Sequence, residues 1–364
     1  MIVLDSVSKN FPGASHFAVR DLSLEVHEGE MVALVGPSGC GKTTTLKMIN
    51  RLIEPTSGSI FMDGRNILKN DPVQLRRGIG YVIQSVGLLP HKTIRQNIAT
   101  VPRLLGWDRS KIDARVQELM EMLSLDGELL SRFPAELSGG QRQRVGVARA
   151  LAVDPPVMLM DEPFGAVDPI VRARLQDQFL ELQQTLRKTI IFVTHDIDEA
   201  IKMSDRIAIL NKGGVLERYD TPEAVLREPG SEFVAMFVGE ERGLKRLALI
   251  KVADIELEAG PVVSSSDAVE EALAKMAAAD SDWASVLEKD QLKGWVESSA
   301  LIGHSLVSEV TPVPFAARVT PTSSLREALD SIVTSRTRVA VVTSQDGRYL
   351  GTLTAGKISK EIAG

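Results

Sequence analysis

Apolar residues recur in short unbroken runs through the first 240 residues, and these runs predict buried strands. Runs without polar alternation are typical of parallel strands that are covered on both faces. The clearest runs span residues 31–35, 79–83, 157–160, 190–194 and 207–210. Segments with helical periodicity lie between them, so the pattern predicts an α/β domain built around a largely parallel sheet over residues 1–240.

The stretch from about residue 88 to residue 151 has a different pattern. Its apolar residues follow helical spacing, as at Val116, Leu119, Met120 and Leu123, and β-branched runs are missing. Spacings of three and four residues place these side chains on one face of a helix. We therefore expect a helical subdomain inserted into the sheet domain.

A polar segment near residues 240–246 predicts a domain boundary, and two similar units follow it. The first unit has apolar groups at residues 263, 272–273, 283–287 and 294–296, and the second at 319, 328–329, 339–342 and 351–353. Each unit predicts the order strand, helix, strand, strand. Because one unit is too small to bury much core, we expect both to pack as one α/β module over residues 241–364, with units at about 246–303 and 304–364.

Composition and charge narrow the functional classes. The chain is 44% hydrophobic and 25% charged, as in ordinary globular proteins. No run approaches the roughly 18–20 apolar residues of a membrane span, and no secretory signal is recognisable, so we expect a cytoplasmic chain. The net charge of −6 argues against a nucleic-acid binder. Cys40 is the only cysteine, which excludes an intramolecular disulfide.

The segment after residues 31–35 is rich in glycine and leads into Lys42 and Thr43 at the start of a helical stretch. Glycines let backbone N–H groups approach a triphosphate closely, and the helix N-terminus adds favourable partial positive charge. Lys42 is expected to reach the β- and γ-phosphates, and Thr43 to place its hydroxyl on Mg²⁺. A plain glycine-rich turn is the alternative, which the strand and helix on either side disfavour. The predicted phosphate-binding residues are Gly36, Ser38, Gly39, Cys40, Gly41, Lys42, Thr43 and Thr44.

Two acids, Asp161 and Glu162, end the run at residues 157–160. Asp161 is predicted to hold Mg²⁺ through its coordinated water, and Glu162 to polarise the attacking water as general base. Acids at a strand end are often plain loop residues. Their partnership with the phosphate loop favours catalysis.

Residues 137–141 form a second anion-binding candidate. Ser138 stands in a capping position at the start of a helix, and the glycine pair after it exposes backbone N–H groups. One ATP needs only one phosphate loop per chain, so the second is expected to engage a nucleotide held by another copy. An ordinary Ser-Gly-Gly helix start is the alternative. The residues concerned are Ser138, Gly139, Gly140 and Gln141.

With these motifs in this order, the first 240 residues resemble the ATP-binding subunits of ABC transporters. The resemblance implies a P-loop NTPase fold, ATP hydrolysis with Mg²⁺, and a homodimer that closes around two ATP molecules. It also implies that Gln84 contacts Mg²⁺ or water and signals to a permease, and that His195 lies near the γ-phosphate. Asp168 corresponds to an aspartate acting across the dimer, although Gly165 replaces the family's usual serine. Phe11 occupies the place of the aromatic that stacks on adenine, with a core position as the alternative.

Further resemblances concern what the ATPase drives. Residues 87–94 resemble the importer form of the segment that meets a permease, with a buried turn as the alternative. Residues 48–58 resemble subunits that power uptake of glycine betaine, choline and carnitine. The C-terminal repeat resembles a tandem CBS pair, which is frequent in that subgroup. These resemblances imply a peripheral protein at the cytoplasmic face of the cell membrane, an integral permease, and an extracellular or periplasmic solute-binding protein reached through the permease.

The CBS-like units depart from the usual pattern for holding ribose. Residues 294–300 and 351–357 end in Ala300 and Lys357 where an acid is usual. Thr354 and Lys357 are candidates for contacting the phosphate of a regulatory adenine nucleotide. A module that only holds a dimer together is the alternative.

Three other functions stay open. They are an importer ATPase for another small solute, a soluble ABC ATPase acting on nucleic acid, and a regulatory module whose ATPase is inactive. The single cassette, short helical insertion and acidic balance speak against action on nucleic acid. Lys42, Glu162 and His195 speak against an inactive enzyme.

Overall fold

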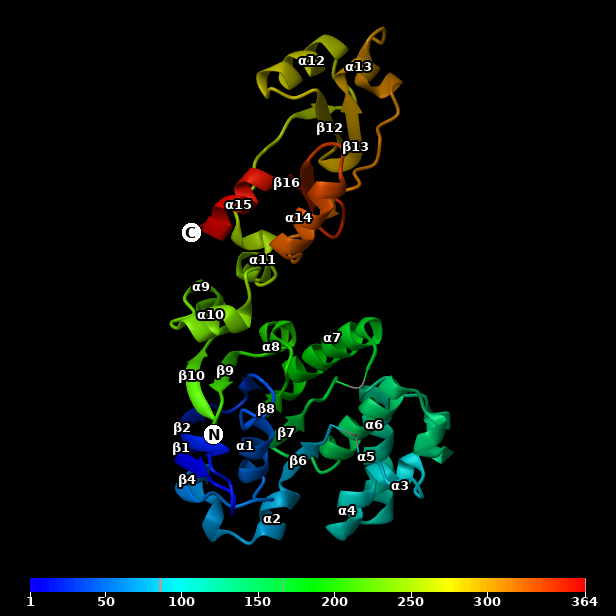
Figure 1. Cartoon of the computed structure of the whole chain (residues 1–364). Coiled ribbons are helices and arrows are strands. Elements are labelled where there is room, and N and C mark those ends of the chain that lie inside the picture. Colours follow the sequence, from blue (N-terminus) through cyan, green and yellow to red (C-terminus); the bar gives the residue numbers. More distant parts are fainter. Residues whose placement is uncertain (85–86, 166, 364) are drawn as a thin grey trace. The chain divides into compact units, whose positions relative to one another are not determined.

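The computed structural model describes residues 1–84, 87–165 and 167–363. The chain divides into two compact units, Met1–Gly239 and Glu240–Gly364 (Figure 1). The first unit contains a six-stranded and a four-stranded sheet, and the second contains two three-stranded sheets. Each unit has hydrophobic clusters of its own.

The six-stranded sheet has the order β10-β9-β3-β8-β7-β6. All neighbours are parallel except the edge strand β10. All five runs predicted as strands are confirmed, and each end differs from the prediction by at most one residue. Strands β3, β7 and β8 are buried at every position, which explains why their sequences carry no polar alternation. The bounds are β3 Met31–Val35, β6 Ile79–Val82, β7 Val157–Asp161, β8 Thr189–Val193, β9 Arg206–Asn211 and β10 Val215–Asp220.

The four-stranded sheet is antiparallel, with the order β2-β1-β4-β5. One hydrophobic cluster joins it to the larger sheet, because it includes Ile2 of β1, Leu46 of α1 and Leu34 of β3. Helix α1 (Lys42–Ile49) thus packs into the core directly after the phosphate loop. The strands are β1 Ile2–Lys9, β2 Val19–Val26, β4 Ser57–Met62 and β5 Arg65–Asn66.

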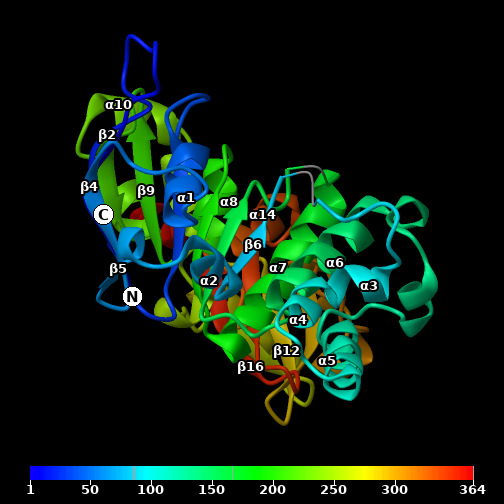
Figure 2. The ribbon, with the colours of Figure 1, turned by 90° about the horizontal axis from the view of Figure 1, so that it is seen from below.

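Between β6 and β7 the described residues form four α-helices, which confirm the predicted helical insertion. We call α3 (Ile94–Ile98), α4 (Thr100–Leu104), α5 (Arg109–Met122) and α6 (Gly139–Leu151) the helical lobe. Both views place this lobe on the side of the parallel sheet away from β1, β2 and β4 (Figure 1, Figure 2). The unit's other helices are α2 Pro72–Arg77, α7 Pro169–Leu186, α8 Ile197–Met203, α9 Pro222–Arg227 and α10 Glu232–Val238. Of all helices in the part of the chain that the structure describes, none is long and apolar enough to span a membrane.

The second unit contains the predicted repeat, and the order strand, helix, strand, strand is confirmed twice. In each repeat a short first strand pairs parallel with the second strand, which pairs antiparallel with the third. The first repeat comprises β11 Val262–Ser264, α12 Val269–Ala278, β12 Trp283–Glu288 and β13 Gln291–Glu297, followed by α13 Ser298–Leu301. The second comprises β14 Arg318–Val319, α14 Leu325–Thr334, β15 Val339–Thr343 and β16 Tyr349–Thr354, followed by α15 Ala355–Ala363.

The sequence suggested two consecutive repeats at 246–303 and 304–364. The structure divides the unit differently. Leu247, at the end of α11 (Arg242–Leu247), and Val252 pack into the core of the second repeat with Leu325, Val342 and Ile358. Residues 247–257 therefore belong to the second repeat although they precede the first. The two-residue strand β14 provides little apolar cover of its own, which gives a physical reason for this arrangement.

Candidate active site

The phosphate loop connects β3 to α1 and lines a cavity of about 500 Å³. Lys42 is the first residue of α1, and its side chain is largely buried. Its ammonium donates hydrogen bonds to the carbonyl oxygens of Gly36 at 2.7 Å and Pro37 at 3.0 Å. The lysine charge is therefore held against the loop backbone. The cavity is lined by Ala18, Ser38, Gly39, Cys40, Gly41, Lys42, Thr43, Thr44, Glu162 and His195.

Close packing behind the loop requires glycine at Gly36. Its φ of 147° is unfavourable for other residues, and a Cβ there would lie 2.1 Å from the carbonyl oxygen of Leu210. The same atom would lie 2.8 Å from the sulfur of Cys40. Gly39 also has a positive φ, 77°, but a Cβ there would meet no atom within 4 Å. A side chain at Gly36 would therefore meet both a steric clash and an unfavourable backbone conformation, whereas a side chain at Gly39 would meet only the unfavourable conformation.

Replacing Gly36 with alanine is expected to destabilise the protein by about 3 kcal/mol, combining backbone strain with overpacking. The matched variant Gly39→Ala adds only the backbone cost, about 1–2 kcal/mol. Chemical denaturation of both variants measures the difference. Equal destabilisation by the two substitutions would contradict the contact with Leu210.

The Thr43 hydroxyl and the Asp161 carboxylate lie side by side. The Thr43 hydroxyl donates a hydrogen bond of 2.9 Å to the carboxylate of Asp161. Burial raises the pKa of Asp161, the Thr43 hydrogen bond lowers it, and the charge of Glu162 raises it. Oxygen ligands suit Mg²⁺, which usually keeps several waters and also takes phosphate oxygens as ligands. The Thr43 hydroxyl and the Asp161 carboxylate are two oxygen groups of the kind that Mg²⁺ takes as ligands, so this pair fits the ion.

Glu162 lies between two other predicted residues. The Gln84 side-chain amide donates a hydrogen bond of 2.7 Å to one carboxylate oxygen, and the His195 Nδ1 lies 3.5 Å from the other. Gln84, Glu162 and His195 follow β6, β7 and β8, so the carboxyl ends of three neighbouring parallel strands bring them together. Glu162 has a φ of 46°, and its N–H donates to the Val193 carbonyl at 2.9 Å. A non-glycine residue held in this region is frequent at functional sites.

Several predicted residues lie outside the described lining of this cavity. Ser138 caps α6, and its hydroxyl accepts from the Gln141 N–H at 3.2 Å while the Gln141 side chain accepts from the Ser138 N–H at 2.9 Å. Asp168 caps α7 in the same way, accepting from the Val171 N–H at 3.1 Å. Phe11 is 41% exposed, with the Lys9 ammonium 5.2 Å from its ring centre. Within the described lining of this cavity, the chain therefore contributes none of Ser138, Gly139, Gly140, Gln141, Asp168 and Phe11.

One cavity residue, Ala18, was missed by the sequence analysis. It precedes β2, and its carbonyl oxygen would lie 2.3 Å from a Cβ built on Gly41. An alanine side chain carries no chemical signal, and only the pairing of distant segments places it at the loop.

Cys40 offers a chemical probe of the loop. It is fully buried, and its sulfur lies 3.7 Å from the Lys42 ammonium. Burial raises the pKa of the Cys40 thiol, although the neighbouring Lys42 lowers it. Because only the thiolate is nucleophilic, modification should be slow near neutral pH and should accelerate as the pH rises toward the raised pKa.

Modification of Cys40 by N-ethylmaleimide is therefore expected to abolish ATP binding, and bound ATP is expected to protect the thiol. Mass spectrometry follows the adduct, and calorimetry measures ATP binding. Cys40→Ser is the control, because it keeps the volume and should keep ATP binding while losing the reaction. Full modification with unchanged ATP affinity would show that the side chain lies away from the phosphates.

Comparison with known proteins places the chain in a family. Residues 19–165 match the ABC transporter family model, and residues 307–364 match the CBS domain model. The chain is 45% identical over 99% of its length to the osmoprotectant import ATP-binding protein OsmV of Salmonella typhimurium, covering 95% of it. It is 51% identical over 82% of its length to the glycine betaine/carnitine/choline transport ATP-binding protein OpuCA of Bacillus subtilis, covering 78% of it. The chain therefore belongs to the ABC transporter family, as an ATP-binding protein with a C-terminal CBS domain.

A solved structure supports the same assignment. The chain is 34% identical to the ATP-binding cassette MJ0796 in its dimeric post-hydrolysis structure bound to ADP and Pi. The TM-score is 0.55, over 61% of this chain and 99% of that chain. The predicted P-loop NTPase fold, the CBS module and the ABC-type ATPase class are confirmed. As an ABC ATPase, the protein binds ATP.

Proposed function

We propose that this protein is the ATP-hydrolysing subunit of an importer for quaternary-amine osmoprotectants of the glycine betaine, choline and carnitine type. The site observation that carries the ATPase part is the position of Glu162, which accepts a hydrogen bond from Gln84, lies beside His195 and lines the phosphate-loop cavity. The relatives' names support the solute class, since they describe osmoprotectant and glycine betaine/carnitine/choline transport. Together these observations favour import over an action on nucleic acid.

Hydrolysis needs an oriented water and a stabilised γ-phosphate. Glu162 accepts a proton from the attacking water, Lys42 supplies positive charge to the β- and γ-phosphates, and His195 orients the γ-phosphate. Thr43, Asp161 and Gln84 are the residues that would hold Mg²⁺, which neutralises phosphate charge when bound. The Thr43 hydroxyl and Asp161 carboxylate already lie in hydrogen-bonding contact, so few side-chain movements are required.

A second copy completes the site in this proposal. Ser138 and Gln141 form a closed capping box at the start of α6, a 13-residue helix whose first N–H groups can bind phosphate. Since these groups lie outside the described cavity lining of their own chain, we infer that they contact the nucleotide of the partner chain. Asp168, at the start of α7, is assigned to the same interface. Phe11 is exposed and therefore free to stack on adenine.

The segment after Gln84 is the proposed contact with the permease. The Asn97 side chain is fully buried and accepts from the Leu89 N–H while donating to the carbonyl oxygens of Leu89 and Lys92. These bonds fix residues 89–92 in one shape. Leu104 of α4 is 67% exposed in the same lobe, as expected where a partner covers apolar surface. The protein would then lie on the cytoplasmic face of the membrane and reach a solute-binding protein through the permease.

For the C-terminal unit we favour a role in holding two copies together. The Lys357 ammonium lies 3.7 Å from the Glu256 carboxylate, and the Lys357 N–H donates to the Thr354 hydroxyl. The two candidate phosphate contacts therefore already have partners. A regulatory adenine nucleotide is the alternative, and heat from titrating AMP into a Lys42→Ala variant of the full chain would support it.

Isolation of the complex from native membranes tests the proposed function. A permease and a solute-binding protein should co-purify, and deletion of the gene should abolish uptake of labelled glycine betaine, choline or carnitine. Uptake of all three solutes at the wild-type rate would overturn the solute class. Recovery with nucleic acid and without any membrane protein would overturn import altogether.

A further inference from the structure

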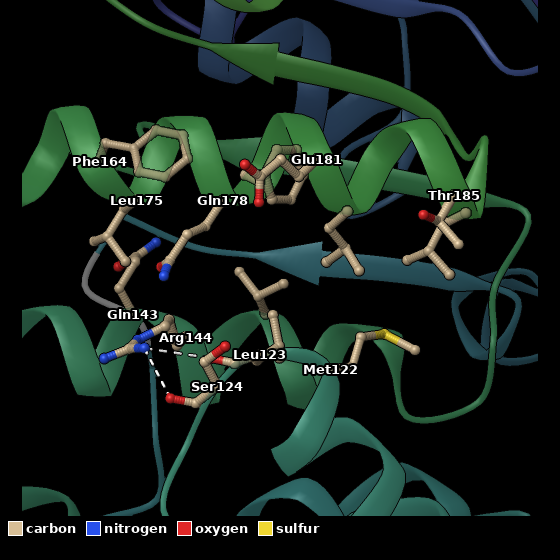
Figure 3. Close-up of a pocket in the computed structure, with 14 residues that line it drawn as sticks. Met122, Leu123, Ser124, Gln143, Arg144, Phe164, Leu175, Gln178, Glu181 and Thr185 are labelled. Atoms are coloured by element: carbon tan, nitrogen blue, oxygen red, sulfur yellow. Dashed lines mark hydrogen bonds between the residues drawn. The ribbon is translucent and has the colours of Figure 1, made fainter. Parts of the chain in front are cut away.

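A second cavity lies away from the ATP site, between the helical lobe and α7. Figure 3 shows it bordered by the end of α5 and by α6 on one side and by α7 on the other. Its volume is about 350 Å³. Small-molecule sites usually measure about 300–1,000 Å³, so the space suits a small ligand.

Most of the cavity wall is apolar. Val147 comes from α6, Phe164 from the loop after β7, and Leu175, Phe179 and Leu182 from α7. The rings of Phe164 and Phe179 pack edge to face with centroids 6.2 Å apart, which gives that wall a fixed shape. An apolar molecule or chain is the occupant that such a wall favours.

One end of the cavity is polar and carries hydrogen-bond donors that have no acceptor. Gln143 is 97% buried, extends from α6 toward α7, and has an amide nitrogen with no partner among the described residues (Figure 3). Arg144 donates to the carbonyl oxygens of Leu123 and Ser124, but its Nε is buried and also unpartnered. Arg144 is half-buried, and this burial lowers the pKa of its guanidinium. A buried amide nitrogen and a half-buried guanidinium whose Nε has no acceptor are unfavourable unless an acceptor reaches them.

We propose that this cavity is a binding site for a small amphipathic carboxylate. Its carboxylate accepts hydrogen bonds from Gln143 and Arg144, and its hydrocarbon part lies along Val147, Phe164 and Leu182. Glu181, exposed on α7, lines the cavity at some distance from Arg144 (Figure 3) and repels a carboxylate bound the other way round. Charge and shape thus define one orientation of the ligand.

Such a ligand would touch two elements of the ATP site. Helix α6 carries Ser138 and Gln141 at its start, and Phe164 follows Glu162 by two residues. If the helical lobe moves during the ATP cycle, ligand affinity must change with that movement, and by linkage the ligand must affect nucleotide binding in return. This last step rests on the proposed function, whereas the binding site itself does not.

Calorimetric titration of the full-length protein with three probes tests the site. Decanoate, below its micellar concentration, is expected to bind with one saturable site per chain. Decanol has the same chain without the charge and should bind about ten- to a hundred-fold more weakly, since it loses charge-assisted hydrogen bonds. Butyrate has the charge without the chain and should give no measurable heat. No saturable decanoate binding, or equal affinities for decanoate and decanol, would overturn the proposal.

Two cavity variants, Leu182→Trp and Gln143→Leu, and one control variant locate the binding within the cavity. Leu182→Trp fills the space and should abolish decanoate binding, while Gln184→Trp, an exposed change on the same helix, should leave it unchanged. Gln143→Leu should lower the affinity for decanoate by about tenfold and leave that for decanol unchanged. This second variant decides the question if Leu182→Trp does not fold. Unchanged decanoate affinity in Gln143→Leu would show that the fatty chain binds elsewhere.

Discussion

Replacing Glu162 with glutamine is expected to slow ATP hydrolysis by about 10²–10⁴-fold while Mg·ATP still binds, which corresponds to roughly 3–5 kcal/mol of activation free energy. The amide cannot accept the proton of the attacking water. It keeps an oxygen that can accept the 2.7 Å hydrogen bond from Gln84, so the geometry of the site is preserved. Phosphate release measures the rate, and calorimetry measures ATP affinity.

The control for this substitution is Glu228→Gln, an exposed acid outside the site, which should leave the rate unchanged. Saturation with Mg·ATP should also accumulate the dimer in Glu162→Gln, because hydrolysis no longer reopens it. Light scattering detects this species. A rate within threefold of wild type would exclude Glu162 as the general base.

Mixing two inactive variants, Lys42→Ala and Ser138→Arg, is expected to restore about a quarter of the wild-type ATPase activity. Each homodimer has both sites disabled. In the mixed dimer, the intact phosphate loop of one chain meets the intact Ser138 segment of the other, so one of its two sites works. Half of the randomly formed dimers are mixed, and each of these has one working site out of two. The expected activity is therefore one quarter of the wild-type value.

The matched control mixes Lys42→Ala with Glu162→Gln. Lys42 and Glu162 line the same cavity of one chain, so every site in the mixed dimer contains one of the two changes. No activity should return. If Lys42→Ala and Ser138→Arg also fail to complement each other while the variants still associate, the site is not shared between copies.

The strands of the parallel sheet could be predicted because the pattern that identifies each strand lies within its own sequence. Strands β3, β7 and β8 are buried on both faces, so their sequences consist of unbroken apolar runs. Strands β1 and β2 were not predicted. Their register shifts near Leu4, Val7 and Lys9, and these shifts interrupt the alternation that identifies a half-buried strand.

The candidate site likewise combines residues that local sequence patterns predict with contacts that only the folded chain creates. Asp161 and Glu162 were predicted because they follow a recognisable strand beside the phosphate loop, whereas His195 was predicted from the resemblance to ABC ATP-binding subunits. The 2.7 Å bond between Gln84 and Glu162, the position of Ala18 and the cavity beside Gln143 depend on packing between distant segments. Single-sequence patterns do not report such packing.

The nesting of the C-terminal repeats has a consequence for synthesis on the ribosome. Leu247 and Val252 emerge before the first repeat, yet their partners Leu325, Val342 and Ile358 emerge only after the whole first repeat. The first repeat can therefore fold while Leu247 and Val252 are still exposed to solvent. A chain that stops before Ala317 lacks every later member of this cluster and keeps Leu247 and Val252 exposed, which makes such incomplete products targets for chaperones and proteases.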